Sequence, residues 1–144
     1  MDKSYTIIAG CGRLGASIAG RLSEQKKDVT VIDIDKAAFR KLPTTFGGLT
    51  VNASATDLEK LKSAQADRAT AFIAVTDDDC VNICAAQIAK NIFNIAKTAA
   101  RICDEDKISL VSGMDIDTIC PTRLSEKEVS DYIHTEDNSY ADKQ

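Results

Sequence analysis

The feature that most constrains the fold is a glycine-rich run, Gly10-Cys11-Gly12-Arg13-Leu14-Gly15, placed between two apolar segments. Residues 5–9 before the run are typical of a buried strand, and residues 14–22 after it have the pattern of a helix. A second apolar run ends at Asp33, eighteen residues beyond Gly15. A strand, a G-x-G-x-x-G turn, a helix and an acid at this spacing form the dinucleotide-binding fingerprint. The sequence therefore predicts a turn that binds an adenine nucleotide.

Each residue of the fingerprint has a physical role. Gly10 permits the tight turn, Gly12 leaves room for a pyrophosphate to approach the backbone, and Gly15 lets the helix pack closely on the strand. The free N–H groups and positive dipole end of the helix favour phosphate. Asp33 is expected to accept hydrogen bonds from ribose hydroxyls, which favours a ribose without a 2′-phosphate.

Apolar runs and capping signals predict strands and helices in alternation along the chain. Strands are expected near 5–9, 29–33, 49–52, 69–75, 97–102 and 117–120, and helices near 13–24, 36–42, 57–63, 78–91 and 105–112. The expected N-caps are Asp35 for the second helix, Thr56 in a capping box with Glu59 for the third, and Thr76 for the fourth. This order predicts an α/β fold with a doubly wound, Rossmann-like parallel sheet as a single domain over residues 1–120.

The C-terminal segment predicts an amphipathic helix over residues 121–134, followed by an acidic tail over 135–144. Residues 125–128 form a second capping box, and Val129, Tyr132 and Ile133 form an apolar stripe. The stripe packs either on its own domain or on a partner. Residues 126–144 hold six acidic and two basic side chains, which accounts for the whole net charge of −4. A neutral body with an acidic end argues against nucleic-acid binding.

Composition and cysteine usage indicate an ordinary globular domain. The 144 residues are 44% hydrophobic and 28% charged, no apolar run approaches the roughly 20 residues that cross a bilayer, and no signal peptide precedes the first strand. We therefore expect a cytoplasmic protein. The five cysteines lack C-x-x-C spacing and a nearby histidine, so we expect reduced, mostly buried thiols and no zinc site. Cys11 is the exception, because the adjacent helix N-terminus would lower its pKa and permit a redox role.

Several polar residues fall at the expected carboxyl ends of strands, where parallel sheets bind ligands. Arg13 and Arg101 are candidate phosphate ligands, although Arg13 also fits a solvated position and Arg101 an ion pair with Asp77–Asp79. Asn82 is expected to hold the loop after the fourth strand. The three acids Asp77–Asp79 fit favourable interactions with a helix dipole better than a divalent cation, so we expect no metal.

Groups for catalysis are missing from the pattern. About 40 residues follow the fifth strand, the single histidine, His134, lies near the C-terminus, and no Tyr-x-x-x-Lys pair or Ser-His-Asp set occurs. The sequence thus predicts a protein that binds a nucleotide without catalysing a reaction, and we expect that it is not an enzyme.

Together these residues resemble the nucleotide-binding domain of the RCK, or KTN, family of potassium-transport regulators, to which the bacterial Trk regulators belong. The resemblance covers residues 5–125. The matching stretches are the G-x-G-R-x-G loop at 10–15, Val31-Ile32-Asp33-Ile34-Asp35, the A-V-T-x-D-D-x-x-N stretch at 74–82, and Ala100-Arg101. One departure stands out, because Ala53 and Ser54 occupy the positions where the family has Gly-Asp.

The resemblance implies a regulatory subunit that binds NAD(H), ATP, ADP or AMP and forms homodimers or higher oligomers. Ligand exchange would gate a membrane potassium channel or transporter. It also implies that Ile34, Ala53 and Ser54 flank adenine and that Thr76 and Arg101 line the phosphate side. The candidate binding residues are Gly10, Cys11, Gly12, Arg13, Leu14, Gly15, Asp33, Ile34, Asp35, Ala53, Ser54, Thr76 and Arg101.

Three alternatives remain open at this level. The first is a small NAD-dependent oxidoreductase or its cofactor-binding fragment. The second is a degenerate fold used only for protein interaction, which the missing acid at Ser54 keeps in consideration. The third is a redox sensor that uses Cys11.

Overall fold

Six parallel strands form one sheet in the order β3-β2-β1-β4-β5-β6. The structure is a computed structural model that describes residues 4–142, with side chains to Thr135. Its strands are β1 (Tyr5–Ala9), β2 (Asp28–Asp33), β3 (Leu49–Asn52), β4 (Ala71–Ala74), β5 (Lys97–Arg101) and β6 (Asp117–Ile119). Its helices are α1 (Arg13–Glu24), η1 (Lys36–Lys41), α2 (Leu58–Ser63), η2 (Ala66–Arg68), α3 (Asp79–Asn91), η3 (Glu105–Val111) and α4 (Pro121–Asp142), where η marks a 3-10 helix. The predicted doubly wound α/β fold is confirmed.

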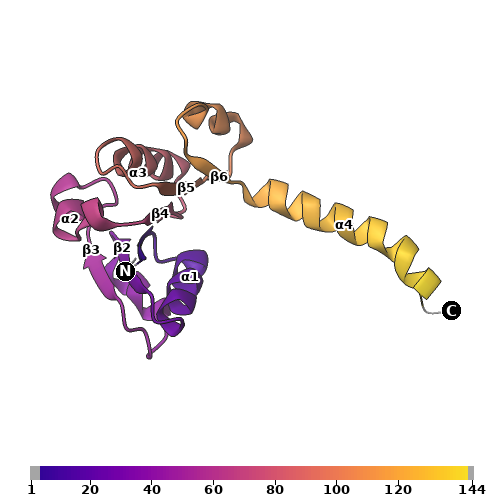
Figure 1. Cartoon of the computed structure of the whole chain (residues 1–144), viewed down its shortest axis with the longest axis horizontal. Helices are drawn as coiled ribbons and strands as arrows, with labels where there is room; N and C mark the ends of the chain where they lie inside the picture. The colour runs from indigo at the N-terminus through magenta and orange to yellow at the C-terminus, as the bar shows by residue number, and fades with distance from the viewer. Residues whose placement is uncertain (1–3, 143–144) are drawn as a thin grey trace.

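Helices cover both faces of the sheet (Figure 1). Alternation along the central strand β1 decides which residues face which layer, since successive side chains of a strand point to opposite sides. Ile7 belongs to the core cluster under α2 and α3, whereas Ile8 belongs to the cluster under α1 and η1, and both are fully buried. The chain crosses from one face to the other in the connection from β3 to β4, and β4 pairs with β1. The half with β1–β3 and the half with β4–β6 therefore meet at the carboxyl ends of β1 and β4.

Two of the expected helix caps are wrong, and in both cases a nearby aspartate caps instead. Asp57 accepts the N–H of Lys60 at the start of α2, while Thr56 lies beside Ser54, with 2.9 Å between the hydroxyl oxygens. Asp78 accepts the N–H groups of two residues in the first turn of α3. A carboxylate outcompetes a hydroxyl as an acceptor for these N–H groups. The expected cap Asp35 is confirmed, because it accepts the N–H of Ala37 at 3.0 Å.

The C-terminal helix α4 begins at the expected residue, ahead of the capping box at 125–128, but continues further than predicted. It starts at Pro121, where a missing N–H costs nothing in the first turn, so Ser125 lies inside the helix and is not its cap. It runs to Asp142 through residues expected as a tail, since no glycine or proline interrupts residues 122–142. The side chains of residues 136–144 lie outside those described.

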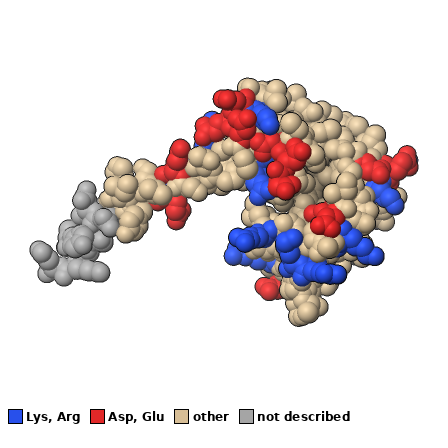
Figure 2. Space-filling model, turned by 180° about the vertical axis from the view of Figure 1, so that it is seen from behind, with Lys and Arg blue, Asp and Glu red and all other residues tan. Residues whose placement is uncertain are grey.

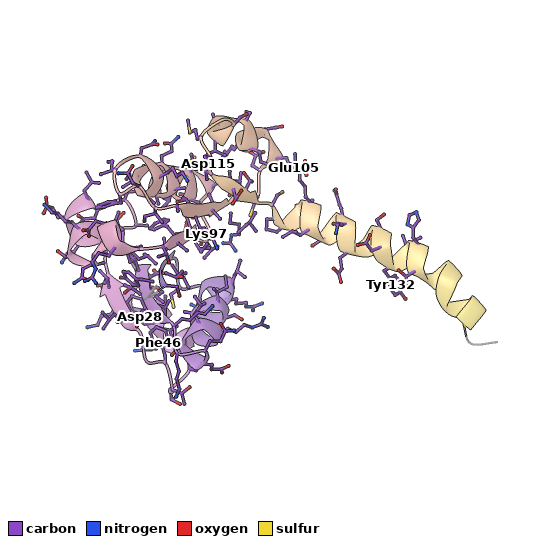
Figure 3. All side chains as sticks on the ribbon, viewed as in Figure 1. Asp28, Phe46, Lys97, Glu105, Asp115 and Tyr132 are labelled. Atoms are coloured by element: carbon purple, nitrogen blue, oxygen red, sulfur yellow. The ribbon has the colours of Figure 1, made fainter. Side chains whose placement is uncertain are left out.

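Among the described residues, no side chain of the body of the protein covers the apolar stripe of α4. The helix leaves the body of the protein after β6 (Figure 1), and Tyr132 points into solvent (Figure 3). Val129, Tyr132 and Ile133 are 56%, 66% and 58% exposed. Of the two alternatives for the stripe, packing on its own domain is therefore wrong, and packing on a partner stays open. Within the part of the chain that the structure describes, no helix is long and apolar enough to cross a membrane.

Candidate functional site

A cavity of about 730 Å³ opens at the carboxyl ends of β1, β2 and β4. Backbone from the glycine run forms one wall, the end of β2 forms a second, and the ends of β4 and β5 form a third. The lining residues are Gly10, Cys11, Gly12, Arg13, Leu14, Ile32, Asp33, Ile34, Asp35, Ala38, Lys41, Ser54, Ala55, Val75, Thr76, Asp77, Asp78, Val81 and Arg101.

The three glycines of the fingerprint do different work in this wall. Gly10 has φ +107°, and a Cβ there would lie 2.7 Å from the backbone nitrogen of Thr76. A Cβ on Gly15 would lie 1.9 Å from the carbonyl oxygen of Gly10, so the helix can approach the strand only without a side chain. A Cβ on Gly12 would meet nothing within 4 Å and would occupy the open cavity. Gly10 and Gly15 therefore shape the turn, and Gly12 keeps space free.

The N-terminus of α1 is open toward the cavity. Gly12 is its N-cap residue and offers no side-chain acceptor to the first turn. By contrast, aspartate side chains cap η1, α2, α3 and η3. The positive end of α1 thus lacks the carboxylate that these four helices have, which leaves it available to an anion.

Asp33 stands at the end of β2 and holds two backbone segments together. One carboxylate oxygen accepts the N–H of Cys11 at 2.7 Å, and the other accepts the N–H of Asp35 at 2.8 Å. Each oxygen retains a lone pair that can accept a ribose hydroxyl. Ile34, the residue between the two aspartates, is 77% exposed at the mouth of the cavity.

The wall at the end of β4 depends on the side chain of Asn82, which is fully buried. Its amide oxygen accepts the N–H and the hydroxyl of Thr76 at 2.9 and 2.6 Å. Its amide nitrogen donates to the carbonyl oxygens of Thr76 and Arg101 at 3.0 and 2.8 Å. All four hydrogen-bonding positions of the amide are used, so Asn82 locks the end of β4 to the end of β5. The expectation that it holds this loop is confirmed.

Arg101 lies against the same wall without the ion pair considered for it. Its guanidinium donates to the carbonyl oxygen of Thr76 at 2.6 Å, and its Nε is buried with no hydrogen-bond partner. Asp79 instead accepts the N–H groups of Cys103 and Asp104 at 2.9 and 2.8 Å. Buried polar groups usually have a hydrogen-bond partner, so the Nε of Arg101 is an exception within the cavity wall.

The structure brings most of the predicted residues together. All thirteen candidates line the cavity except Gly15 and Ala53. Gly15 packs behind the loop, and Ala53 donates its N–H to the carbonyl oxygen of Asp33 at 3.1 Å while packing against the core. Sequence reasoning missed Lys41 as a lining residue. It considered Asp77 and Asp78 as partners of a helix dipole, of Arg101 or of a divalent cation, but not as part of the nucleotide cavity. No local pattern marks Lys41, because the length of η1 decides where that side chain falls.

The thiols differ from expectation. Burial raises the pKa of the Cys11 thiol, as does the Asp33 carboxylate, and the positive charge of Lys41 offsets this only in part. The expected lowering of its pKa by the helix N-terminus is wrong, so Cys11 lacks the reactive thiolate of a redox sensor. Cys80, Cys84 and Cys103 are exposed, and the expectation of mostly buried thiols is wrong for these three.

Comparison with known proteins agrees with this geometry. The TrkA-N domain profile matches residues 6–121. The chain is 37% identical over 119 residues to the Trk system potassium uptake protein TrkA of Streptomyces coelicolor, covering 83% of this chain and 53% of that one. It therefore spans about half the length of this relative.

Solved structures share the fold at low identity. The TrkA-N domain of the inner membrane protein ybaL from Escherichia coli has a TM-score of 0.80 and 15% identity, and the match covers 91% of this chain and 97% of that one. The GsuK channel bound to NAD has a TM-score of 0.77 and 20% identity, with coverage of 98% and 25%. Both the matched profile and the Streptomyces relative extend over most of the sequence, and this chain belongs to the TrkA-N domain family.

Proposed function

We propose that this chain is a regulatory domain of potassium transport that binds NAD(H) or an adenine nucleotide and transmits its occupancy to a partner. One observation carries the proposal: the uncapped N-terminus of α1 faces an open cavity at Gly12, the one position of the fingerprint where a Cβ would enter free space. The names of the relatives supply the context, since they include potassium uptake proteins and a channel bound to NAD.

The lining of the cavity offers a partner for each part of such a ligand. Backbone N–H groups at Gly12 and Arg13 would bind phosphate, and the guanidinium charge of Arg101 would face it from the wall at the end of β5. Asp33 would hold the ribose, with Ile34 and Ser54 beside the adenine. Ligands that share adenosine but differ in their phosphates would thus be distinguished at Gly12, Arg13 and Arg101, while Asp33 would bind all of them.

Binding in this cavity requires no catalytic group. The single histidine of the chain, His134, lies on α4, where its ring nitrogen is 2.7 Å from the carbonyl oxygen of Ser130. It is remote from the cavity. We propose that the domain acts by binding alone and is not an enzyme.

A path of one hydrogen bond and two short stretches of chain connects the cavity to α4. Arg101 ends β5 in the cavity wall, and the next residue, Ile102, donates its N–H to the carbonyl oxygen of Ile119 at 2.9 Å. Ile119 ends β6, two residues before α4 begins. Suppose that α4 has two positions relative to the sheet. A ligand that binds Arg101 can favour one position only if it binds the protein with different affinity in the two. This path is the structural element through which that difference would act.

We further propose that residues 1–120 form the nucleotide-binding domain, residues 121–134 a dimerisation helix and residues 135–144 an acidic end. In this division α4 pairs with the same helix of a second copy. Its exposed stripe is long enough to bury apolar surface in a homodimer. The oligomer would contact a membrane potassium channel or transporter from the cytoplasmic side.

The test is a calorimetric titration of the chain with NAD⁺, NADH, ATP, ADP and AMP. Saturable binding of at least one is expected, and Asp33→Ala should weaken every ligand that binds by a similar factor. Asp67→Ala changes an exposed acid of η2, away from the cavity, and serves as the control. Thermal unfolding of the variants separates lost binding from lost structure. The absence of binding at millimolar concentrations, or an Asp33→Ala effect confined to NAD, would contradict the proposal.

A further inference from the structure

The nucleotide cavity continues into a second hollow along α1. This groove, of about 770 Å³, is lined by Arg13, Ala16, Ser17, Gly20, Arg21, Glu24, Lys41 and Pro43. Two cations, Arg13 and Lys41, line both hollows and therefore stand where one opens into the other. On the face shown in Figure 2, basic side chains gather over the lower half of the body, and acidic side chains gather over the upper half and the root of α4.

The cations at this junction lack acidic partners. Among the described residues, no ion pair involves Arg13, Arg21 or Lys41. Of the acids that line the two hollows, Asp33, Asp35 and Asp78 accept backbone N–H groups, and Asp77 and Glu24 form no ion pair among the described residues. The junction is therefore a place where positive charge is not neutralised within the domain.

Tertiary packing brings Lys41 to the glycine run. Ala38 and Phe39 of η1 pack in the same core cluster as Ala16 and Ala19 of α1, so the end of η1 lies against the first helix. The charge of Lys41 reaches Cys11 in the run, where it lowers the pKa of the thiol against the larger effect of burial. Lys41 is thus on the same side of the cavity as Gly12 and the open end of α1.

We infer that Lys41 binds a phosphoryl group of the nucleotide, beside Arg13. The inference rests on the proposed function, and it adds a binding residue that neither the fingerprint nor the family resemblance assigns. The ammonium group is a flexible point charge suited to phosphate, whereas Arg13 offers a planar fork. The phosphoryl group recognised belongs either to the 5′ chain or to the 2′ position of the ribose, and phosphorylated probes of each kind distinguish the two.

The experiment compares the full chain with Lys41→Met and Arg40→Met by calorimetric titration. Methionine keeps the apolar stem of the side chain without its charge, and Arg40 is the exposed neighbour on η1 that lines neither hollow. The probes are adenosine, ADP, NAD⁺ and NADP⁺, each at low and moderate salt. Lys41→Met should weaken at least one phosphorylated probe about 10-fold and reduce its salt dependence. Adenosine binding and the Arg40→Met variant should stay at wild-type affinity.

Each outcome decides the inference. Weaker ADP and NAD⁺ binding assigns Lys41 to the 5′ phosphates, and a loss confined to NADP⁺ assigns it to the 2′-phosphate. Unchanged binding of all phosphorylated probes by Lys41→Met refutes the inference while leaving the proposed function intact, as does an equal loss for adenosine. A wild-type chain that binds none of the four probes refutes the proposed function and this inference with it. Equal unfolding temperatures of the two variants show that the comparison is between folded proteins.

Discussion

Alanine substitutions at Gly12 and Gly15 should separate binding from folding within one short loop. In the structure, a Cβ on Gly15 would sit 1.9 Å from the carbonyl oxygen of Gly10, far inside the roughly 3.5 Å at which such atoms normally touch. The neighbour is backbone, so α1 must move away from β1. We expect Gly15→Ala to destabilise the domain by about 3 kcal/mol or more, which lowers the unfolding temperature by roughly 6–12 °C.

Gly12→Ala should give the opposite pattern. Its Cβ would meet nothing within 4 Å, and φ −79° is open to any residue. The change costs at most about 1 kcal/mol of folding free energy, because alanine is a poorer N-cap than glycine. The methyl group instead occupies the space through which a phosphate would approach the N–H groups of α1. Losing one charge-assisted hydrogen bond corresponds to a rise in Kd of roughly 10- to 100-fold.

The assay is circular dichroism melting combined with calorimetric titration of NAD⁺ and ADP. Gly47→Ala is the matched control, because its Cβ would make only an ordinary contact, 3.6 Å from Ser23 Oγ, and Gly47 lies outside the cavity. The control should keep both stability and affinity. The reasoning fails for binding if Gly12→Ala binds both ligands like the wild type. It fails for folding if Gly15→Ala melts at the same temperature as Gly12→Ala.

Three further predictions concern stability. Asn82→Ala removes four hydrogen bonds made by a fully buried amide and should lower the free energy of unfolding by about 2–4 kcal/mol in urea titrations; a change under about 1 kcal/mol would contradict its role as the lock between β4 and β5. Lys26 ends α1 with φ +58°, so Lys26→Gly should raise the free energy of unfolding by about 0.5–1 kcal/mol, whereas Lys26→Ala should give no gain. Burial alone would raise the pKa of the Asp79 carboxyl, but the N–H groups of Cys103 and Asp104 outweigh it and hold that pKa below its usual value. Because the folded pKa is the lower one, Asp79 stabilises the protein above about pH 4 and loses this contribution as the pH falls through the folded pKa. Asp79→Asn should reduce the fall of the unfolding temperature at low pH in melting curves recorded from pH 2 to 7. An unchanged fall would count against this prediction.

Much of the fold could be predicted because its signals are local. Apolar runs predict strands that are buried on both faces. The glycine run predicts a turn whose geometry only glycine allows at Gly10 and Gly15. The position of Asp33 at the end of β2 follows from the length of the apolar run that ends at this residue. Helix boundaries were less predictable, because Thr56 and Asp57 compete as caps and their partners decide the outcome.

The sequence alone determined the order of elements, the parallel sheet and the residues that bound the cavity at the ends of β1 and β2, since these depend on spacing along the chain. Only the tertiary structure decided which side chains meet across it. Thr76 and Arg101 are 25 residues apart, and their hydrogen bond exists because β4 and β5 are neighbours in the sheet. Lys41 lies near the glycine run because the 3-10 helix η1 packs on α1. The apolar stripe of α4 is exposed because no described part of the sheet domain covers it. Contacts of this kind depend on how separate elements pack, and periodicity within one element carries no information about that packing.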